Sequence, residues 1–247
     1  MVSAVSIIFP ILLLFSLGEA VTRGGRATYV EYQVSIRDSS YGPPICGGAI
    51  ISSRWVITTA QCAEKIYTRD GWIVDGTLEA SKPGSIREKA EVVFHPDYNN
   101  PVGYADIALI RVSKDFFLDD NTKPVTLSSI PILIGETGKV SGWGATYFGG
   151  PNSDVLMYLH LPVIDHTNCS VNLAEVNYQV HNDQYCAGEI GNDAATCTVD
   201  AGGPMVSNNY GTLIGLVSRN SCTYDGRPTV FTNVGYYRDW INSVTGV

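Results

Sequence analysis

The sequence predicts an all-β protein, and three observations favour that class. The chain has 247 residues with 25 glycines and 12 prolines, which interrupt the apolar stretches at short intervals. Several short segments alternate apolar and polar residues with the two-residue period of a half-buried strand. Apolar residues at helical spacing occur only in the C-terminal tail. We therefore expect many short strands joined by turns, with one helix at the end.

The first twenty residues differ from the rest of the chain. Residues 5–17 are almost wholly apolar, and the small residues Gly18 and Ala20 suit a signal peptidase. This run is broken by Pro10 and is too short to span a bilayer comfortably. We predict a cleaved secretory signal over residues 1–20 and a secreted, extracellular mature chain over 21–247. An uncleaved anchor is the alternative, because the usual basic residues at the start of a signal are missing.

The first strand expected after the signal covers residues 32–36, which alternate apolar and polar side chains. Residues 115–131 combine charges with two prolines and are the best candidate for a linker. They divide the chain into halves at about 21–122 and 123–235.

Two more strands are expected in the second half, at 133–140 and 212–217. In the tail, Trp240, Ile241 and Val244 can share one face of a helix. This spacing predicts a C-terminal helix at about 236–245 that packs on the body of the protein.

The charge balance argues against two classes of partner. The chain has 16 basic and 24 acidic residues and a formal net charge of −8. Binding to nucleic acid or to an anionic membrane depends on an excess of basic residues. We expect neither partner. We also expect no cofactor and no metal. A zinc site in particular is disfavoured, because the sequence contains no Cys/His cluster at ligand spacing.

An even number of cysteines in a secreted chain predicts disulfides. The six residues are Cys46, Cys62, Cys169, Cys186, Cys197 and Cys222. Six cysteines allow fifteen connectivities, and the pairing of neighbours along the chain is one of them.

Six sequence blocks together carry a family resemblance. They are Cys46-Gly-Gly, Trp55-Val-Ile-Thr-Thr-Ala-Gln-Cys62, Asp106-Ile-Ala-Leu, Ser141-Gly-Trp-Gly144, Cys197-x-x-Asp-x-Gly-Gly-Pro204 and Trp240-Ile. In this order the blocks resemble the trypsin-like serine proteases (peptidase S1 fold) from about residue 24 to the C-terminus. The resemblance implies two six-stranded antiparallel β-barrels with an active-site cleft between them and a C-terminal helix. It also implies the disulfides 46–62, 169–186 and 197–222.

The catalytic positions of that family are only partly kept. Such a protease needs a hydroxyl nucleophile, an imidazole base and a carboxylate that orients the imidazole. The histidine position is Gln61, whose amide does not exchange a proton near pH 7, and the serine position is Ala201. Asp106 survives. We expect it to be structural, accepting backbone N–H groups near Ala60 and Gln61.

The family's oxyanion hole consists of backbone N–H groups at Ala201 and at the residue two positions earlier. That residue is Val199 here, where the family has glycine. A β-branched residue does not readily adopt a positive φ, so we expect the hole to be unformed.

The specificity pocket of the family has changed at four positions. Ala195 stands where trypsin-like members have an aspartate, and Arg219 stands in place of a tryptophan wall. Asn220 and Thr229 replace two glycines that keep the pocket open. Together these changes predict an occluded cleft.

Activation also differs from the family pattern, in which a newly formed terminal amine pairs with the acid matching Asp200. The segment Val21-Thr-Arg-Gly-Gly25 contains no Arg-Ile bond for the activating cleavage. Because a buried unpaired charge is costly, we expect zymogen-like loops over 197–204.

These features predict a secreted pseudoprotease that acts by binding protein. The chain most resembles the scabies mite inactivated serine protease paralogues related to the mite group 3 allergens. That resemblance implies immune evasion through inhibition of host complement. Clip-domain serine protease homologues of arthropods and vertebrate granule homologues share the broken triad. They remain alternative groups that this chain resembles. Two other functions stay open, a decoy for protease inhibitors or substrates and a residual hydrolase using Thr198 as nucleophile. The sequon Asn168-Cys-Ser170 leaves glycosylation open, because its middle residue is a disulfide candidate.

Overall fold

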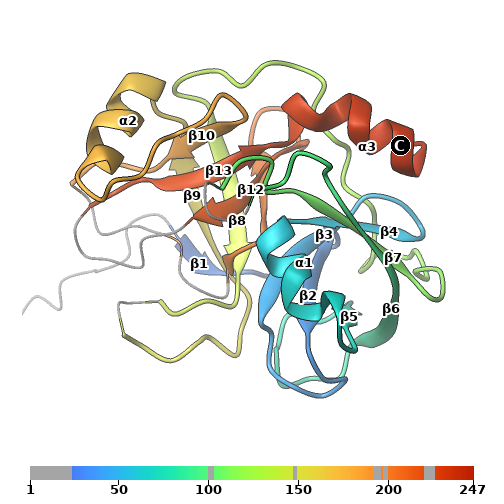
Figure 1. The fold of residues 1–247 in the computed structure, drawn as a ribbon. Coiled ribbons are helices and arrows are strands. Elements are labelled where there is room, and N and C mark those ends of the chain that lie inside the picture. Colours follow the sequence, from blue (N-terminus) through green and yellow to red (C-terminus); the bar gives the residue numbers. More distant parts are fainter. Residues whose placement is uncertain (1–23, 100–102, 147–148, 192–195, 197–199, 220–225) are drawn as a thin grey trace, which may run out of the picture.

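A computed structural model of the chain describes residues 24–99, 103–146, 149–191, 196, 200–219 and 226–247 (Figure 1). The segment expected to be a secretory signal, residues 1–20, lies outside the described residues. Within the described residues, no helix has the length and apolar character needed to cross a membrane.

The first half of the chain forms a closed barrel of antiparallel strands in the order β2-β3-β4-β7-β6-β5. The strands are β2 (Gln33–Arg37), β3 (Cys46–Ile50), β4 (Trp55–Thr58), β5 (Trp72–Asp75), β6 (Ser85–Phe94) and β7 (Ala108–Val112). A cluster of buried aliphatic side chains, including Val34, Ile36 and Ile110, fills the barrel. Burying this apolar surface is the main stabilising contribution to the fold of this half.

The second half forms an antiparallel sheet in the order β1-β9-β8-β11-β12-β13-β10. The strands are β1 (Gly24–Arg26), β8 (Thr137–Gly142), β9 (Met157–Pro162), β10 (Gln184–Ala187), β11 (Pro204–Ser207), β12 (Leu213–Arg219) and β13 (Thr229–Asn233). An isolated bridge between Val163 and Ala187 joins the segment after β9 to β10. The expected all-β fold is confirmed. The expected six-stranded second barrel is instead a sheet of seven strands, because β1 adds to it from the first half of the chain.

Two strand expectations are confirmed and one is shifted. β2 and β12 cover most of the segments expected at 32–36 and 212–217. The strand expected from residue 133 begins only at Thr137. Residues 133–136 form a turn in which the Glu136 N–H donates to the Leu133 carbonyl, with Gly135 at a φ of 82°.

The expectation of a single helix was wrong. The described residues contain α1 (Ala60–Tyr67), α2 (His166–Ala174), the 3-10 helix η2 (Val234–Tyr237) and α3 (Arg238–Thr245). α1 and α2 have 8 and 9 residues, which is shorter than the window over which helical periodicity can be recognised. α3 confirms the expected C-terminal helix, although the turn before it is η2.

The largest hydrophobic cluster lies between the two halves. It joins barrel residues such as Ile57 and Leu109 to sheet residues such as Leu216 and to Ile241 of α3. Figure 1 shows α3 crossing from the sheet to the barrel side of the molecule. Residues 113–136 connect the halves with no helix or strand, apart from a bridge between Leu127 and Leu213. The boundary at 122/123 stays a prediction.

Two of the three expected disulfides are confirmed. Cys46–Cys62 joins β3 to α1, and Cys169–Cys186 joins α2 to β10. Cys197 and Cys222 lie outside the described residues, so their pairing stays a prediction.

Candidate functional site

Gln61 lies in the first turn of α1, directly after β4. The first N–H groups of a helix have no carbonyl partner within it, and Thr59 at the N-cap makes no side-chain hydrogen bond to them. The Gln61 N–H instead donates to Asp106 Oδ1 at 2.9 Å. Asp106 therefore caps α1, and the helix dipole favours a negative charge at this end. The backbone contact expected for Asp106 is present.

The Asp106 carboxylate is fully buried. Its Oδ2 accepts a hydrogen bond from Ser218 Oγ at 2.6 Å and one from Gln61 Nε2 at 3.1 Å. Burial raises the pKa of Asp106 to about 6, against the lowering effect of hydrogen bonds from Ser218, Gln61 and Ala60. The side-chain amide of Gln61 thus donates to the carboxylate but offers no base.

Ala201 lies in a loop that both halves hold in place. Its carbonyl accepts the Gly47 N–H at 2.8 Å, and the Gly202 N–H donates to the Val217 carbonyl at 2.8 Å. Its methyl packs against the hydrophobic cluster of the barrel that contains Cys62. This side chain has no atom able to attack a carbonyl carbon.

The Asp200 carboxylate contacts the backbone of the sheet half. The Gly144 N–H donates to Asp200 Oδ1 at 2.9 Å. The chain before Gly24 and residues 197–199 lie outside the described residues. The loss of the amine partner and the zymogen-like loop conformation therefore stay predictions.

Thr229 is the first residue of β13 and is buried. Its Oγ1 lies 3.0 Å from Oγ1 of Thr196, which is also buried. Nearby, the Gly191 N–H donates to the Gly226 carbonyl at 3.0 Å. The segments before β13 and after β10 are therefore joined by both side-chain and backbone hydrogen bonds.

Arg219 ends β12 and is exposed. Its guanidinium carbon lies 4.5 Å from the centre of the Tyr178 ring, a cation–π contact. The Tyr178 hydroxyl lies 3.1 Å from Gln184 Oε1, and Gln184 Nε2 donates to the Gly103 carbonyl at 3.0 Å. The hydrogen bonds between Tyr178, Gln184 and Gly103 thus fix the position of the ring that the Arg219 guanidinium contacts.

Several positions named from the sequence lie outside the described residues. They are Ala195, Thr198, Val199 and Asn220. The expected loss of the oxyanion hole therefore stays a prediction. The expected effects of Ala195 and Asn220 on the specificity pocket also stay predictions. The structure brings Gln61 and Asp106 into direct contact, and it places Arg219 next to Ser218, which bonds to Asp106.

Sequence reasoning missed the roles of Ser218 and Thr196. Ser218 lies 112 residues from Asp106 along the chain, and Thr196 lies 33 residues from Thr229. No periodicity signal links residues so far apart. The available signal was chemical, because a buried carboxylate and a buried threonine both need hydrogen-bond partners.

Two further sequence features have defined places. Asn168 lies exposed on α2, next to the buried Cys169 of a disulfide, so glycosylation there stays open. In the parts of the chain that the structure describes, no three His, Cys, Asp or Glu side chains gather closely enough to hold a metal ion.

Comparison with known proteins agrees with the fold. Residues 20–241 match the family described as Trypsin. The chain is 32% identical to trypsin zeta of Drosophila erecta over 229 residues, covering 87% of this chain and 81% of that protein. It is 32% identical to trypsin of Phaedon cochleariae over 230 residues, covering 91% and 88%. It is 31% identical to human transmembrane protease serine 11B over 212 residues, which are 83% of this chain but only 51% of that longer protein. On this evidence the chain belongs to the trypsin family.

Proposed function

We propose that this trypsin-family protein is a secreted pseudoprotease, which has no peptidase activity and acts by binding protein. The observation that carries the proposal is the contact between Gln61 and Asp106. In a working triad an imidazole bonds to the carboxylate and takes the proton of the nucleophile. Here an amide donates to Asp106 Oδ2 instead, and near pH 7 an amide neither takes up nor releases a proton.

The second catalytic position supports the same conclusion. Ala201 has neither a hydroxyl nor a thiol, and its methyl packs against the barrel core. Loss of the nucleophile or of the base removes most of the rate enhancement of a triad, and the two losses are not additive. Restoring one of them alone would therefore give little activity.

The hydroxyl pair of Thr229 and Thr196 supports a filled specificity pocket. A glycine at position 229 would have no side chain there, whereas the threonine hydroxyl is 3.0 Å from its partner. Burial of both side chains leaves no room between them for a substrate side chain.

A folded, disulfide-linked protein that lacks a catalytic base and nucleophile can still bind other proteins, and this is the role we propose. The resemblance to the inactivated mite paralogues points to components of host complement as partners, in an extracellular setting. A decoy for protease inhibitors is the competing role. The buried Thr229 argues against it, because such inhibitors insert a side chain into an open pocket.

The first experiment measures hydrolysis by the chain from residue 21 with its disulfides intact. Peptide amides, peptide esters and a fluorophosphonate probe are tested beside an active trypsin and the same trypsin with its nucleophilic serine changed to alanine. We expect rates equal to those of the serine-to-alanine trypsin and no labelling by the probe. Turnover that survives repurification and is lost on Thr198→Val would refute the proposal.

A second experiment identifies partners by pull-down from vertebrate plasma and mass spectrometry, with the blocked trypsin as control. Selective recovery of complement components would support the proposed partners. Recovery of protease inhibitors alone would favour the decoy, and recovery of nothing specific would contradict a plasma partner.

A further inference from the structure

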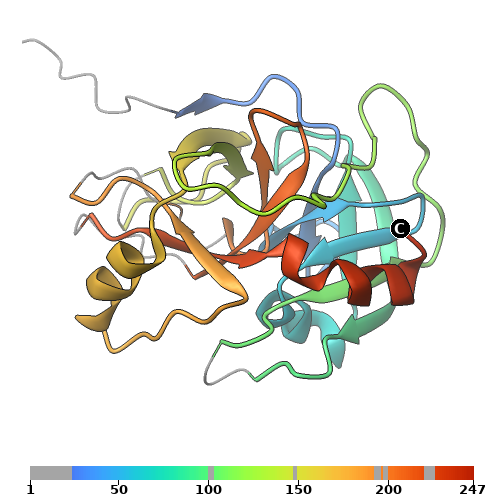
Figure 2. The ribbon, with the colours of Figure 1, turned by 90° about the horizontal axis from the view of Figure 1, so that it is seen from above.

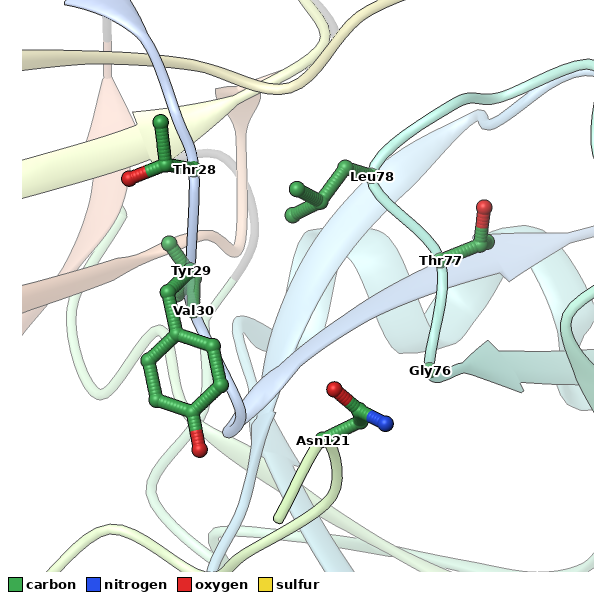
Figure 3. Close-up of a pocket in the computed structure, with 7 residues that line it drawn as sticks. All are labelled: Thr28, Tyr29, Val30, Gly76, Thr77, Leu78 and Asn121. Atoms are coloured by element: carbon green, nitrogen blue, oxygen red, sulfur yellow. The ribbon is translucent and has the colours of Figure 1, made fainter.

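A small pocket lies where three separate segments of the chain meet. It has a volume of about 60 Å³ and lies between residues 28–30, 76–78 and Asn121. Figure 3 shows the Leu78 side chain above the hollow, the Tyr29 ring on one side and the Asn121 amide below. Figure 2 shows that the segment after β1 runs on the face opposite α1, which carries Gln61. The pocket is thus separate from the former catalytic positions.

Hydrogen bonds fix each wall of this pocket. The Tyr29 hydroxyl donates to the Asp120 carbonyl, so the ring bridges from the first segment to the third. The Asn121 N–H donates to Asp119 Oδ1 at 2.7 Å. The Leu78 carbonyl accepts Trp143 Nε1 at 3.2 Å. A pocket that is already formed binds a ligand with little loss of conformational entropy.

The lining combines an apolar surface with available polar atoms. Leu78, Val30 and the Tyr29 ring are the apolar part. Among the described residues, the structure shows no hydrogen bond from the Asn121 carboxamide, whereas the Thr28 side chain points away from the hollow (Figure 3). A ligand with an apolar stem and a hydrogen-bonding head would match both parts.

The volume limits the size of that ligand. A single water occupies about 10–15 Å³, so a space of about 60 Å³ holds only a small group such as one side chain. This is the size of a single leucine or lysine side chain, and it is too small for an aromatic ring system with two rings.

The surrounding charge selects between those side chains. Within two residues of the lining segments, acids outnumber bases: Glu31, Asp75, Glu79, Asp119 and Asp120 against Arg26 and Lys123. The Asp75 carboxylate pairs with the buried Arg87 and Glu79 pairs with Lys82, whereas Asp120, whose side chain is 97% exposed, pairs with Lys123. The whole chain is also acidic. A cationic head is therefore favoured over an apolar one.

We propose that this pocket binds the side chain of a lysine presented by a partner protein. The four methylenes lie against Leu78 and the Tyr29 ring, and the ammonium reaches the Asn121 carboxamide oxygen and the acidic rim. Lys123 is an internal competitor, because its Nζ lies 3.0 Å from Asp120 Oδ1. The inference rests on the proposed function only in treating protein binding as the role, and it holds or fails independently of the hydrolysis assays.

The test is a titration of the ¹⁵N-labelled chain from residue 21 with Nα-acetyl-lysine methylamide, followed by amide chemical shifts at low salt. The norleucine and Nε-acetyl-lysine analogues, which lack the ammonium, are the ligand controls. We expect saturable shifts at residues 28–30, 76–78 and 121 with a millimolar dissociation constant. Affinity should fall at least tenfold for both analogues and severalfold in 0.3 M salt.

Matched variants locate the site. Asn121→Phe removes the carboxamide, fills the pocket and should abolish the shifts, whereas Asn168→Phe, the same change at an exposed asparagine of α2, should not. Asp119→Asn keeps the acceptor for a backbone N–H and removes the charge, so it should weaken binding two- to fivefold. Asp165→Asn makes the same change at the cap of α2 and should have no effect. Lys123→Gln should tighten binding by a similar factor.

Three results would overturn the proposal. The first is an equal response to the norleucine analogue, which would show that the charge is not recognised. The second is unchanged binding in Asn121→Phe while its spectrum shows a folded protein. The third is a set of shifts confined to other residues.

Discussion

Replacing Asp106 by asparagine should stabilise the protein relative to the wild type, and this gain should be larger at neutral pH than at acid pH. The carboxylate is fully buried, and its hydrogen-bond partners shown here are neutral donors, the Gln61 backbone and amide and the Ser218 hydroxyl. Burial raises the pKa of Asp106 from 3.8 to about 6. The native protein therefore holds this proton more tightly than the unfolded chain does.

The sign and size of the effect follow from linkage between proton binding and folding. Below pH 3.8 both states hold the proton, and the full contribution to stability is present. As the pH rises from 3.8 to about 6, the unfolded chain loses the proton first, and stability falls. The free energy of unfolding falls by about 3 kcal/mol in total, since each unit of difference between the two pKa values corresponds to about 1.4 kcal/mol.

The Asp106→Asn variant removes this loss because asparagine does not titrate. Its carbonyl can accept the Gln61 N–H, and its amide can donate to a rotated Gln61 amide. In urea unfolding followed by tryptophan fluorescence, the stability of the variant relative to the wild type should rise by about 3 kcal/mol between pH 3.5 and 7.5. Asp165→Asn controls for the loss of one carboxylate that also caps a helix. A difference that stays flat with pH would refute the reasoning, because the donors would then compensate fully for burial.

Three further changes test how the surroundings of the site are held together, each by urea unfolding at pH 7.5. Lys89→Met should lower the free energy of unfolding by about 1–2 kcal/mol, because Lys89 Nζ donates to three carbonyls at the end of α1. An unchanged free energy of unfolding would show that the ammonium is equally stable in water. Thr229→Val should cost about 1–3 kcal/mol by leaving the Thr196 hydroxyl buried without its partner, and the double valine variant should recover most of it. Gly202→Ala should cost at least about 2 kcal/mol, because this residue has a φ of 76° and a Cβ would lie 2.6 Å from the Gly47 carbonyl oxygen; a stable alanine variant would show that the loop can move.

The strands were predictable from their apolar patterns, which are the two-residue period in β2 and a mostly apolar run in β12. The turn at residues 133–136 broke that rule, because the apolar residues Leu133 and Ile134 are exposed rather than packed. Hydrophobic periodicity assumes that apolar side chains are buried, so an exposed apolar loop is read as part of the following strand.

The candidate site was predictable at the positions of a sequence motif and not at the contacts between them. Gln61 and Ala201 were identified from the blocks that contain them, and their chemistry follows from residue type alone. The bond from Ser218 to Asp106 depends on the irregular pairing of β12 between Val217 and Arg219, which a sequence does not reveal. The proposed loss of chemistry thus follows from residue types in the sequence, and the structure adds the contacts that these residues make.

We propose that glutamine at position 61 removes the base, and its amide keeps the buried Asp106 carboxylate hydrogen-bonded. The Gln61 amide supplies an N–H to Asp106 Oδ2 at 3.1 Å, as an imidazole could, so the buried carboxylate keeps its donors. Leucine has a volume similar to that of glutamine but lacks the N–H donor. Gln61→Leu should therefore lower the free energy of unfolding at pH 7.5 by about 1–3 kcal/mol and raise the pKa of Asp106 further. Gln61→His should unfold at nearly the same urea concentration as the wild type. Equal stability of the leucine variant would contradict this account, since the amide would then contribute nothing to holding the carboxylate.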